Sequence, residues 1–272
     1  MTRLQIIFIR HAAVLVLFTL ITAMCWETAS AQDAWTRKHF TQWDRKDVER
    51  VMNDSPWVAS QEVRINYARQ VQMVAGAPST NTDIGGPALV RTEQNTAAVG
   101  GARAPLDFLF RLRLRSGLPI RAALLREKQL NADYDHLGEK ERLAFDAKWE
   151  GILQCPACAE NYVVTLSSSS KEQPGADAVY SVFKGGRLAD LQRYVYIASE
   201  NGERRALVHF VPPKAPGEEA IFYFARNDEK GAPLFNPKSR ELIFNLTNNE
   251  ISLIANFRVN VSRLLIDGEV SF

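Results

Sequence analysis

The most constraining feature of the sequence is a strict alternation over residues 107–115, which read DFLFRLRLR. Successive side chains of a β-strand point to opposite faces, so this pattern gives the segment one apolar face and one charged face. The apolar face comprises Phe108, Phe110, Leu112 and Leu114. The segment therefore predicts a half-buried strand.

Alternation recurs along the chain and dominates its second half. Residues 62–74 predict an earlier half-buried strand, and residues 162–166 predict a short one. Asn201-Gly202 supplies the positive φ angles of a tight hairpin turn. The other strand candidates are residues 194–198, 206–211, 220–225, 241–247, 251–261 and 264–272.

Three segments predict helices. In residues 41–53, Thr41 and Asp44 have the spacing of a capping box, and Pro56 ends the segment because it forces the preceding residue out of the α region. The other two helices cover residues 119–130 and 138–153. We therefore expect an α+β fold, in which an N-terminal helix and strand region precedes a mainly antiparallel β C-terminal region.

The first 31 residues have the pattern of a signal peptide. Arg3 and Arg10 precede an uncharged run over residues 12–26, and Ala29 and Ala31 form the small-residue site that signal peptidase requires. We expect cleavage after Ala31, which would leave an exported protein in the periplasm or the extracellular space.

Two other fates of this leader are possible, and the sequence disfavours both. An uncleaved membrane anchor is disfavoured because Arg10-His11 shortens the apolar run. Lipid attachment at Cys25 is disfavoured because the preceding Met24 is not small. Beyond the signal peptide (residues 1–31), we expect a helix and strand (32–74), a flexible loop without aromatic residues (75–104) and an α+β body (105–272).

Charge and motifs favour a binding protein over an enzyme. The 33 basic and 31 acidic residues leave a formal net charge of +2, which predicts no strong attraction to nucleic acid. The common catalytic motifs are missing, so catalytic residues stay unknown and no cofactor or metal is expected. We expect a soluble module of the cell envelope with no membrane span after cleavage, whose partner is another envelope protein or an anionic polymer.

Cys155 and Cys158 form the sharpest local motif, C-P-A-C. In an exported chain such a pair predicts a structural disulfide. Thiol-disulfide activity is the main alternative, but thioredoxin-like sites place the motif at the start of a helix, whereas here a predicted helix ends at the motif and a strand follows. A zinc site would need two further ligands, which the scattered histidines do not supply.

Arg111, Arg113 and Arg115 lie on the charged face of the predicted strand. Three arginines in a row suit phosphate, sulfate or an anionic polymer. The alternative is an ordinary solvated face that acidic residues on neighbouring strands balance. Trp43 and Trp57 pose a similar choice, because they could form a docking surface for a partner or pack in the core.

Residues 43–57 read WDRKDVERVMNDSPW, a W-x(3)-D-x(6)-D-S-P-W signature just after the signal peptide. This run resembles the opening of a family of uncharacterised exported bacterial proteins. Residues 116–123 (SGLPIRAA), the C-P-A-C motif and residues 264–272 are also similar to that family. The resemblance implies export and a shared architecture, but it implies no activity.

Overall fold

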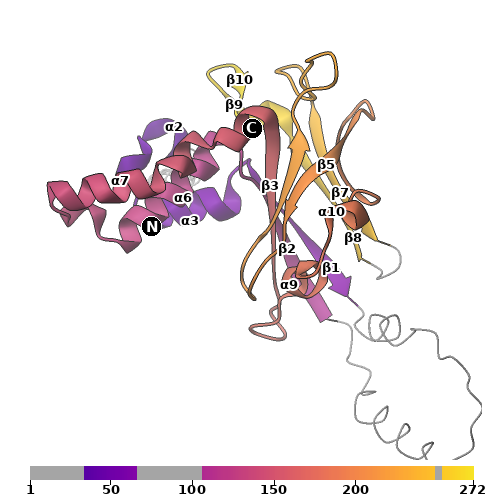
Figure 1. Ribbon diagram of the computed structural model, residues 1–272, viewed down its shortest axis with the longest axis horizontal. Helices are drawn as coiled ribbons and strands as arrows, with labels where there is room; N and C mark the ends of the chain where they lie inside the picture. The colour runs from indigo at the N-terminus through magenta and orange to yellow at the C-terminus, as the bar shows by residue number, and fades with distance from the viewer. Residues whose placement is uncertain (1–33, 66–105, 249–252) are drawn as a thin grey trace, which may run out of the picture.

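The computed structural model describes residues 34–65, 106–248 and 253–272, and an eight-stranded antiparallel sheet dominates it (Figure 1). The strands follow the order β1-β2-β3-β6-β5-β4-β7-β8 across the sheet. This architecture confirms the α+β class. The strands are β1 (Val58–Ile65), β2 (Leu106–Leu114), β3 (Asn161–Ser169), β4 (Val195–Ser199), β5 (Arg204–Val211), β6 (Ala220–Ala225), β7 (Glu241–Asn248) and β8 (Leu253–Asn260).

The two outermost strands of this sheet contact each other, so the sheet is strongly curved. The backbone N–H of Asn256 in β8 donates to Oε1 of Gln61 in β1, at 3.0 Å. A side chain thus takes the place of a ladder hydrogen bond where the first and last strands meet. Each strand turns its apolar side chains toward the enclosed face.

Aromatic side chains fill that face. Phe222 packs edge-on against Phe183 and Phe244, and in both pairs the ring centroids are 5.6 Å apart. Phe244 also packs against Phe257 from β8, at 6.1 Å. Edge-to-face packing is the geometry that aromatic pairs prefer, so these contacts add to the free energy gained by burial alone.

The helices form a separate lobe on one side of the sheet, as Figure 1 shows. The lobe consists of α2 (Ala34–Arg37), α3 (Arg45–Asp54), α6 (Leu118–Asn131) and α7 (Glu139–Gln154), with the 3-10 turns η1 (Phe40–Gln42) and η2 (Tyr134–His136). α6 contacts both α3 and α7. Among the residues that the structure describes, no helix is both long and apolar enough to cross a membrane.

Smaller elements connect these parts. They are α8 (Pro156–Glu160), α9 (Ala178–Phe183), α10 (Leu188–Leu191), η3 (Val261–Leu264) and a hairpin of β9 (Leu265–Ile266) and β10 (Glu269–Val270). The hairpin divides the strand candidate over residues 264–272 at Asp267-Gly268, a pair that is a turn signal in the sequence. Asp267 and Gly268 have φ angles of 52° and 82°, and two consecutive positive φ angles turn the chain back on itself.

The strongest periodic patterns were read correctly. The strand predicted over residues 107–115 is β2, and its four apolar side chains are all 0% exposed. The helices predicted over residues 119–130 and 138–153 are α6 and α7, each displaced by one residue at either end. The prediction for residues 62–74 meets β1 only up to Ile65. Its remainder, the loop predicted over residues 75–104 and the signal peptide lie outside the described residues.

The first helix was predicted too long, because the cap was misplaced. α3 begins at Arg45, whereas Thr41 lies in η1. Asp44 is the N-cap residue: its Oδ1 accepts from the backbone N–H of Asp47 at 2.8 Å. In return Oδ2 of Asp47 accepts from the backbone N–H of Asp44 at 3.3 Å, which completes a capping box one turn later than expected.

The two lobes meet at the indole of Trp57, which is 1% exposed. Its Nε1 donates to the main-chain oxygen of Ser271 at 2.6 Å. Gly117, at the start of α6, lies against the same ring. A Cβ at Gly117 would lie 2.4 Å from Cδ1 of Trp57 and 3.0 Å from the main-chain oxygen of Ser271, so only glycine fits this close approach.

We expect Gly117→Ala to destabilise the protein by about 1–3 kcal/mol, the usual cost of overpacking a well-packed site. The measurement is the free energy of unfolding from urea titrations. Gly151→Ala is the matched control, because a Cβ at Gly151 meets nothing within 4 Å and the residue lies inside α7. Alanine there should stabilise the helix by about 0.5–1 kcal/mol. Equal effects of the two substitutions would contradict the packing described for Trp57.

Candidate functional site

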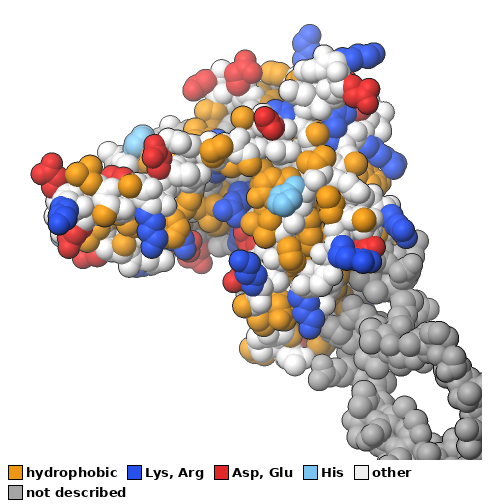
Figure 2. Space-filling view, viewed as in Figure 1, with side chains coloured by type: hydrophobic (Ala, Val, Ile, Leu, Met, Phe, Trp, Pro, Cys, Tyr) orange, Lys and Arg blue, Asp and Glu red, His pale blue; other side chains and the backbone are white. Residues whose placement is uncertain are grey.

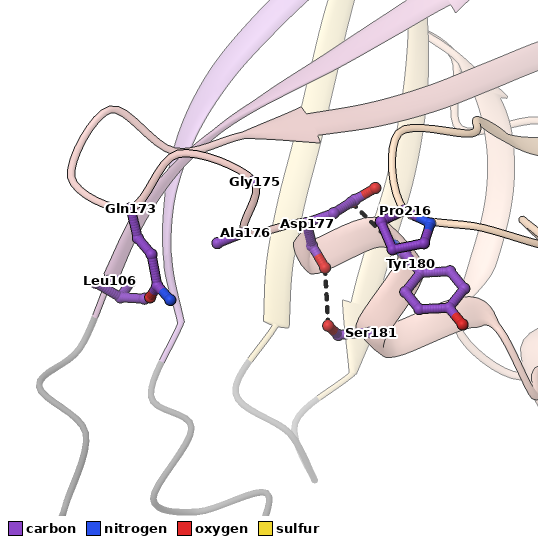
Figure 3. Close-up of a pocket in the computed structure, with 8 residues that line it drawn as sticks. All are labelled: Leu106, Gln173, Gly175, Ala176, Asp177, Tyr180, Ser181 and Pro216. Atoms are coloured by element: carbon purple, nitrogen blue, oxygen red, sulfur yellow. Dashed lines mark hydrogen bonds between the residues drawn. The ribbon is translucent and has the colours of Figure 1, made fainter.

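Four hollows in the surface of the described residues are candidate sites. The hollow in Figure 3 has a volume of about 200 Å³ and lies where the loop before α9 meets Pro216. Its one acidic side chain is already engaged. Oδ1 of Asp177 accepts from Ser168 Oγ and from the backbone N–H of Tyr180, and Oδ2 accepts from the backbone N–H of Gly217. Asp177 therefore caps α9 and fixes a loop rather than facing a ligand.

Two further hollows border α3. One, of about 220 Å³, lies between α3 and α6 and includes both Arg113 and Glu127. The other, of about 360 Å³, lies between the end of α3 and the strands β1 and β8. Of its two arginines, Arg258 pairs with Glu241 at 2.7 Å, and the charge of Arg263 is matched by that of Asp54 in the same lining. Neither hollow offers an excess of one charge for a ligand.

The fourth hollow has a volume of about 340 Å³ and lies where the helical lobe meets the sheet; we call it the junction pocket. It brings together the end of α7, the start of α6, the residue after β6 and the segment after β10. Its lining residues are Ser116, Arg121, Gln154, Cys155, Pro156, Cys158, Ala159, Arg226, Val270, Ser271 and Phe272. These include two arginines and, among the described residues, no Asp or Glu.

Arg121 reaches the pocket from the first turn of α6. Its Nη1 donates to the main-chain oxygens of Leu153 and Gln154, the latter at 3.3 Å. These carbonyls belong to the last turn of α7, where helix geometry leaves them without partners inside the helix. Nε of Arg121 is buried and has no hydrogen-bond acceptor within the described part of the chain. Burial and the nearby charge of Arg226 lower the pKa of the Arg121 guanidinium.

Arg226 enters the pocket from the opposite side. Its Nη1 donates to the main-chain oxygen of Phe272 at 2.7 Å, and its Nη2 to that of Cys158 at 3.0 Å. The guanidinium also lies 4.4 Å from the ring centroid of Tyr162. Burial lowers the pKa of Arg226, and the nearby Tyr162 opposes this effect. Neither arginine forms an ion pair with a described Asp or Glu side chain.

The disulfide Cys155–Cys158 forms part of the wall of the same pocket. Cys155 is half-buried, whereas Cys158 is 7% exposed. As predicted, α7 ends at the motif and a strand, β3, follows it, but the short helix α8 was not predicted: Cys155 both ends α7 and begins α8, with Pro156 in the first turn. Proline suits that position because its fixed φ angle matches a helix and its missing N–H is not needed there.

The predicted arginine stripe is not a free surface throughout. Nε of Arg113 donates to the main-chain oxygen of Met52 at 2.8 Å, and its Nη1 pairs with Glu219, the residue before β6. The anion-binding hypothesis for the stripe therefore loses one of its three charges to an acidic partner. Arg111 lies beside Arg113, and its buried Nε has no acceptor among the described residues; burial lowers the pKa of its guanidinium. Arg115 is half-buried beyond the end of β2.

Trp43 and Trp57 are 2% and 1% exposed, respectively. Their rings pack in the core, which is the alternative that the sequence left open, so neither ring can present a docking surface in this structure. Charges on the visible face are mixed in sign (Figure 2). His136 and Asp133, near the start of α7, pair with each other at 2.7 Å, and no described His, Cys, Asp or Glu residues group into a metal site.

The junction pocket could not have been predicted from the sequence. Arg226 stands in no motif, and Arg121 is separated from it by more than 100 residues. The C-P-A-C motif and residues 116–123 and 264–272 all contribute to the lining, but no local pattern indicated that they lie together.

No protein-family model, no curated protein and no solved structure matches this chain. The resemblance to exported bacterial proteins therefore stays a prediction, and the geometry of the described residues carries the functional argument.

We expect Arg113→Ala to destabilise the protein by about 1–3 kcal/mol, because Glu219 would lose its guanidinium partner in a site where both side chains are largely shielded from water. Arg115→Ala is the control, since Arg115 makes no ion pair within the described ranges, and its effect should stay within about 0.5 kcal/mol. Urea titration measures both. Equal losses would show that the pair with Glu219 contributes nothing specific.

Proposed function

We propose that the protein is an exported module of the bacterial cell envelope that binds an anionic group of a partner in the junction pocket. The leader pattern of residues 1–31 supports export, and the pair of cysteines suits an oxidising compartment. The arginines of the pocket support the choice of ligand.

The observation that carries the proposal is the presence of two guanidinium groups in one pocket whose described lining includes no Asp or Glu. Like charges repel and partial burial weakens their hydration, so both effects favour the arrival of an anion. Nε of Arg121 is a buried donor without an acceptor, and a ligand oxygen could satisfy it.

The pocket also limits what the anion can be. A volume of about 340 Å³ is at the lower end of the range for small-molecule sites. Arginine binds planar carboxylates and phosphate oxygens through paired hydrogen bonds. We therefore favour a single phosphate or carboxylate group, carried by a small molecule or by the end of a larger partner, over a long polyanion lying across the surface.

The test is a titration of the oxidised protein with inorganic phosphate at constant ionic strength, followed by the melting temperature. A ligand at ten times its Kd stabilises the folded state by about 1.4 kcal/mol, which raises the Tm of a protein of this size by about 2–5 °C. Arg121→Gln should abolish the rise. Arg263→Gln removes an exposed arginine outside the pocket and should leave it unchanged. An equal rise in all three proteins would reduce the effect to general salt stabilisation and contradict the proposal.

Export has its own test, the intact mass of the chain recovered from a bacterial host that expresses residues 1–272. We expect a product that begins at Gln32, because Ala29 and Ala31 form the cleavage site. Replacing both alanines with Leu should prevent processing and retain the leader. A wild-type product that keeps Met1 would overturn the predicted location.

A further inference from the structure

We propose that the disulfide Cys155–Cys158 is redox-active and accepts electrons from exported protein dithiols, with Cys155 as the sulfur that substrate attacks. This activity is separate from anion binding, but it shares the arginines of the junction pocket.

The two cysteines differ in their exposure to solvent. Cys155 is half-buried at the pocket surface, whereas Cys158 is 7% exposed. An incoming thiolate can therefore approach Cys155 more readily than Cys158. Redox-active cysteines are partly exposed and lie in positively charged surroundings, while inert structural ones are buried.

The charge of the pocket also bears on reactivity. The carboxyl end of a helix carries partial negative charge, so the end of α7 would by itself disfavour a thiolate at Cys155. Arg121 removes this obstacle, because its guanidinium binds the main-chain oxygens of Leu153 and Gln154. Arg226 binds the main-chain oxygen of Cys158. Both guanidinium groups line the same pocket as the two cysteines, and a nearby guanidinium stabilises a thiolate.

The backbone conformation of Cys155 bears on reactivity as well. Cys155 has φ 42° and ψ 70°, a left-handed conformation that glycine usually occupies at the end of a helix. A cysteine there costs roughly 1 kcal/mol relative to glycine. Two backbone hydrogen bonds, from Cys155 to Gly151 O and from Cys158 to Cys155 O, hold the turn independently of the sulfur bridge. The bridge is thus not needed to form the turn, which suits a pair that is opened and closed.

The reaction balances without a further cofactor. A substrate thiolate attacks Sγ of Cys155; the Cys155–Cys158 bond breaks, and Cys158 leaves as a thiolate. The second thiolate of the substrate then attacks its own sulfur in the mixed disulfide and releases Cys155. Two electrons pass from the substrate, which becomes a disulfide, to the protein, whose two sulfurs become thiols or thiolates.

The test has two arms. In the Cys158→Ala protein, the rate of alkylation of Cys155 by iodoacetamide is followed against pH. We expect a pKa for Cys155 at least about 1 below the ordinary value of about 8.5, and a higher pKa after the additional change Arg121→Gln. Arg263→Gln is the matched control and should not move the pKa.

In the second arm, the wild-type protein is equilibrated with reduced and oxidised glutathione, and its thiols are counted by mass after trapping. A redox-active pair becomes partly reduced in such buffers, whereas a structural disulfide stays oxidised. The proposal would be overturned if the pKa of Cys155 is ordinary or raised and does not change with Arg121→Gln. It would also be overturned if the disulfide stays oxidised in the glutathione buffers. Neither outcome touches the phosphate titration, which uses the oxidised protein.

Discussion

The contact of Trp57 with Gly117 and Ser271 is the constraint on which the rest of the structure depends. It joins three segments at one point: the turn between α3 and β1, which contains Trp57, the start of α6, and the segment after β10. Because the indole donates to a main-chain oxygen and fills the space a side chain at residue 117 would need, the three segments have little freedom relative to one another. The contact thereby fixes Arg121 and Phe272 at the junction pocket. Arg226 is held there in turn, because it donates to the main-chain oxygen of Phe272.

The four segments on which the predicted resemblance to exported bacterial proteins rests lie far apart in the sequence and meet at this junction. Trp57 belongs to the first of them, Arg121 to the second, the cysteines to the third and Ser271 to the fourth. Trp57 touches the second and fourth through Gly117 and Ser271, and residues of the last three line the pocket. Four stretches that are far apart in the sequence therefore contribute to a single place in the fold.

Periodic segments were predictable because burial of one face imposes a period that a sequence displays directly. β2 shows this in its four buried side chains, and α6 and α7 match their predicted ranges closely. Features set by a few residues were not predictable in this way. One of them is α8, which has five residues and begins at Pro156. The hairpin predicted at Asn201-Gly202 does join β4 to β5, but only Gly202 has the expected positive φ. Arg121 and Arg226 come together only through the tertiary structure, and no local sequence pattern indicates that they share a pocket.

A crystal of the oxidised protein soaked in selenate would show whether the junction pocket binds an anion, because anomalous scattering from selenium locates the ion. We expect a selenate oxygen within hydrogen-bond distance of Nε of Arg121, with Arg226 on the other side of the ion. Selenate bound elsewhere on the surface, with the junction pocket holding only water, would contradict the proposed anion binding.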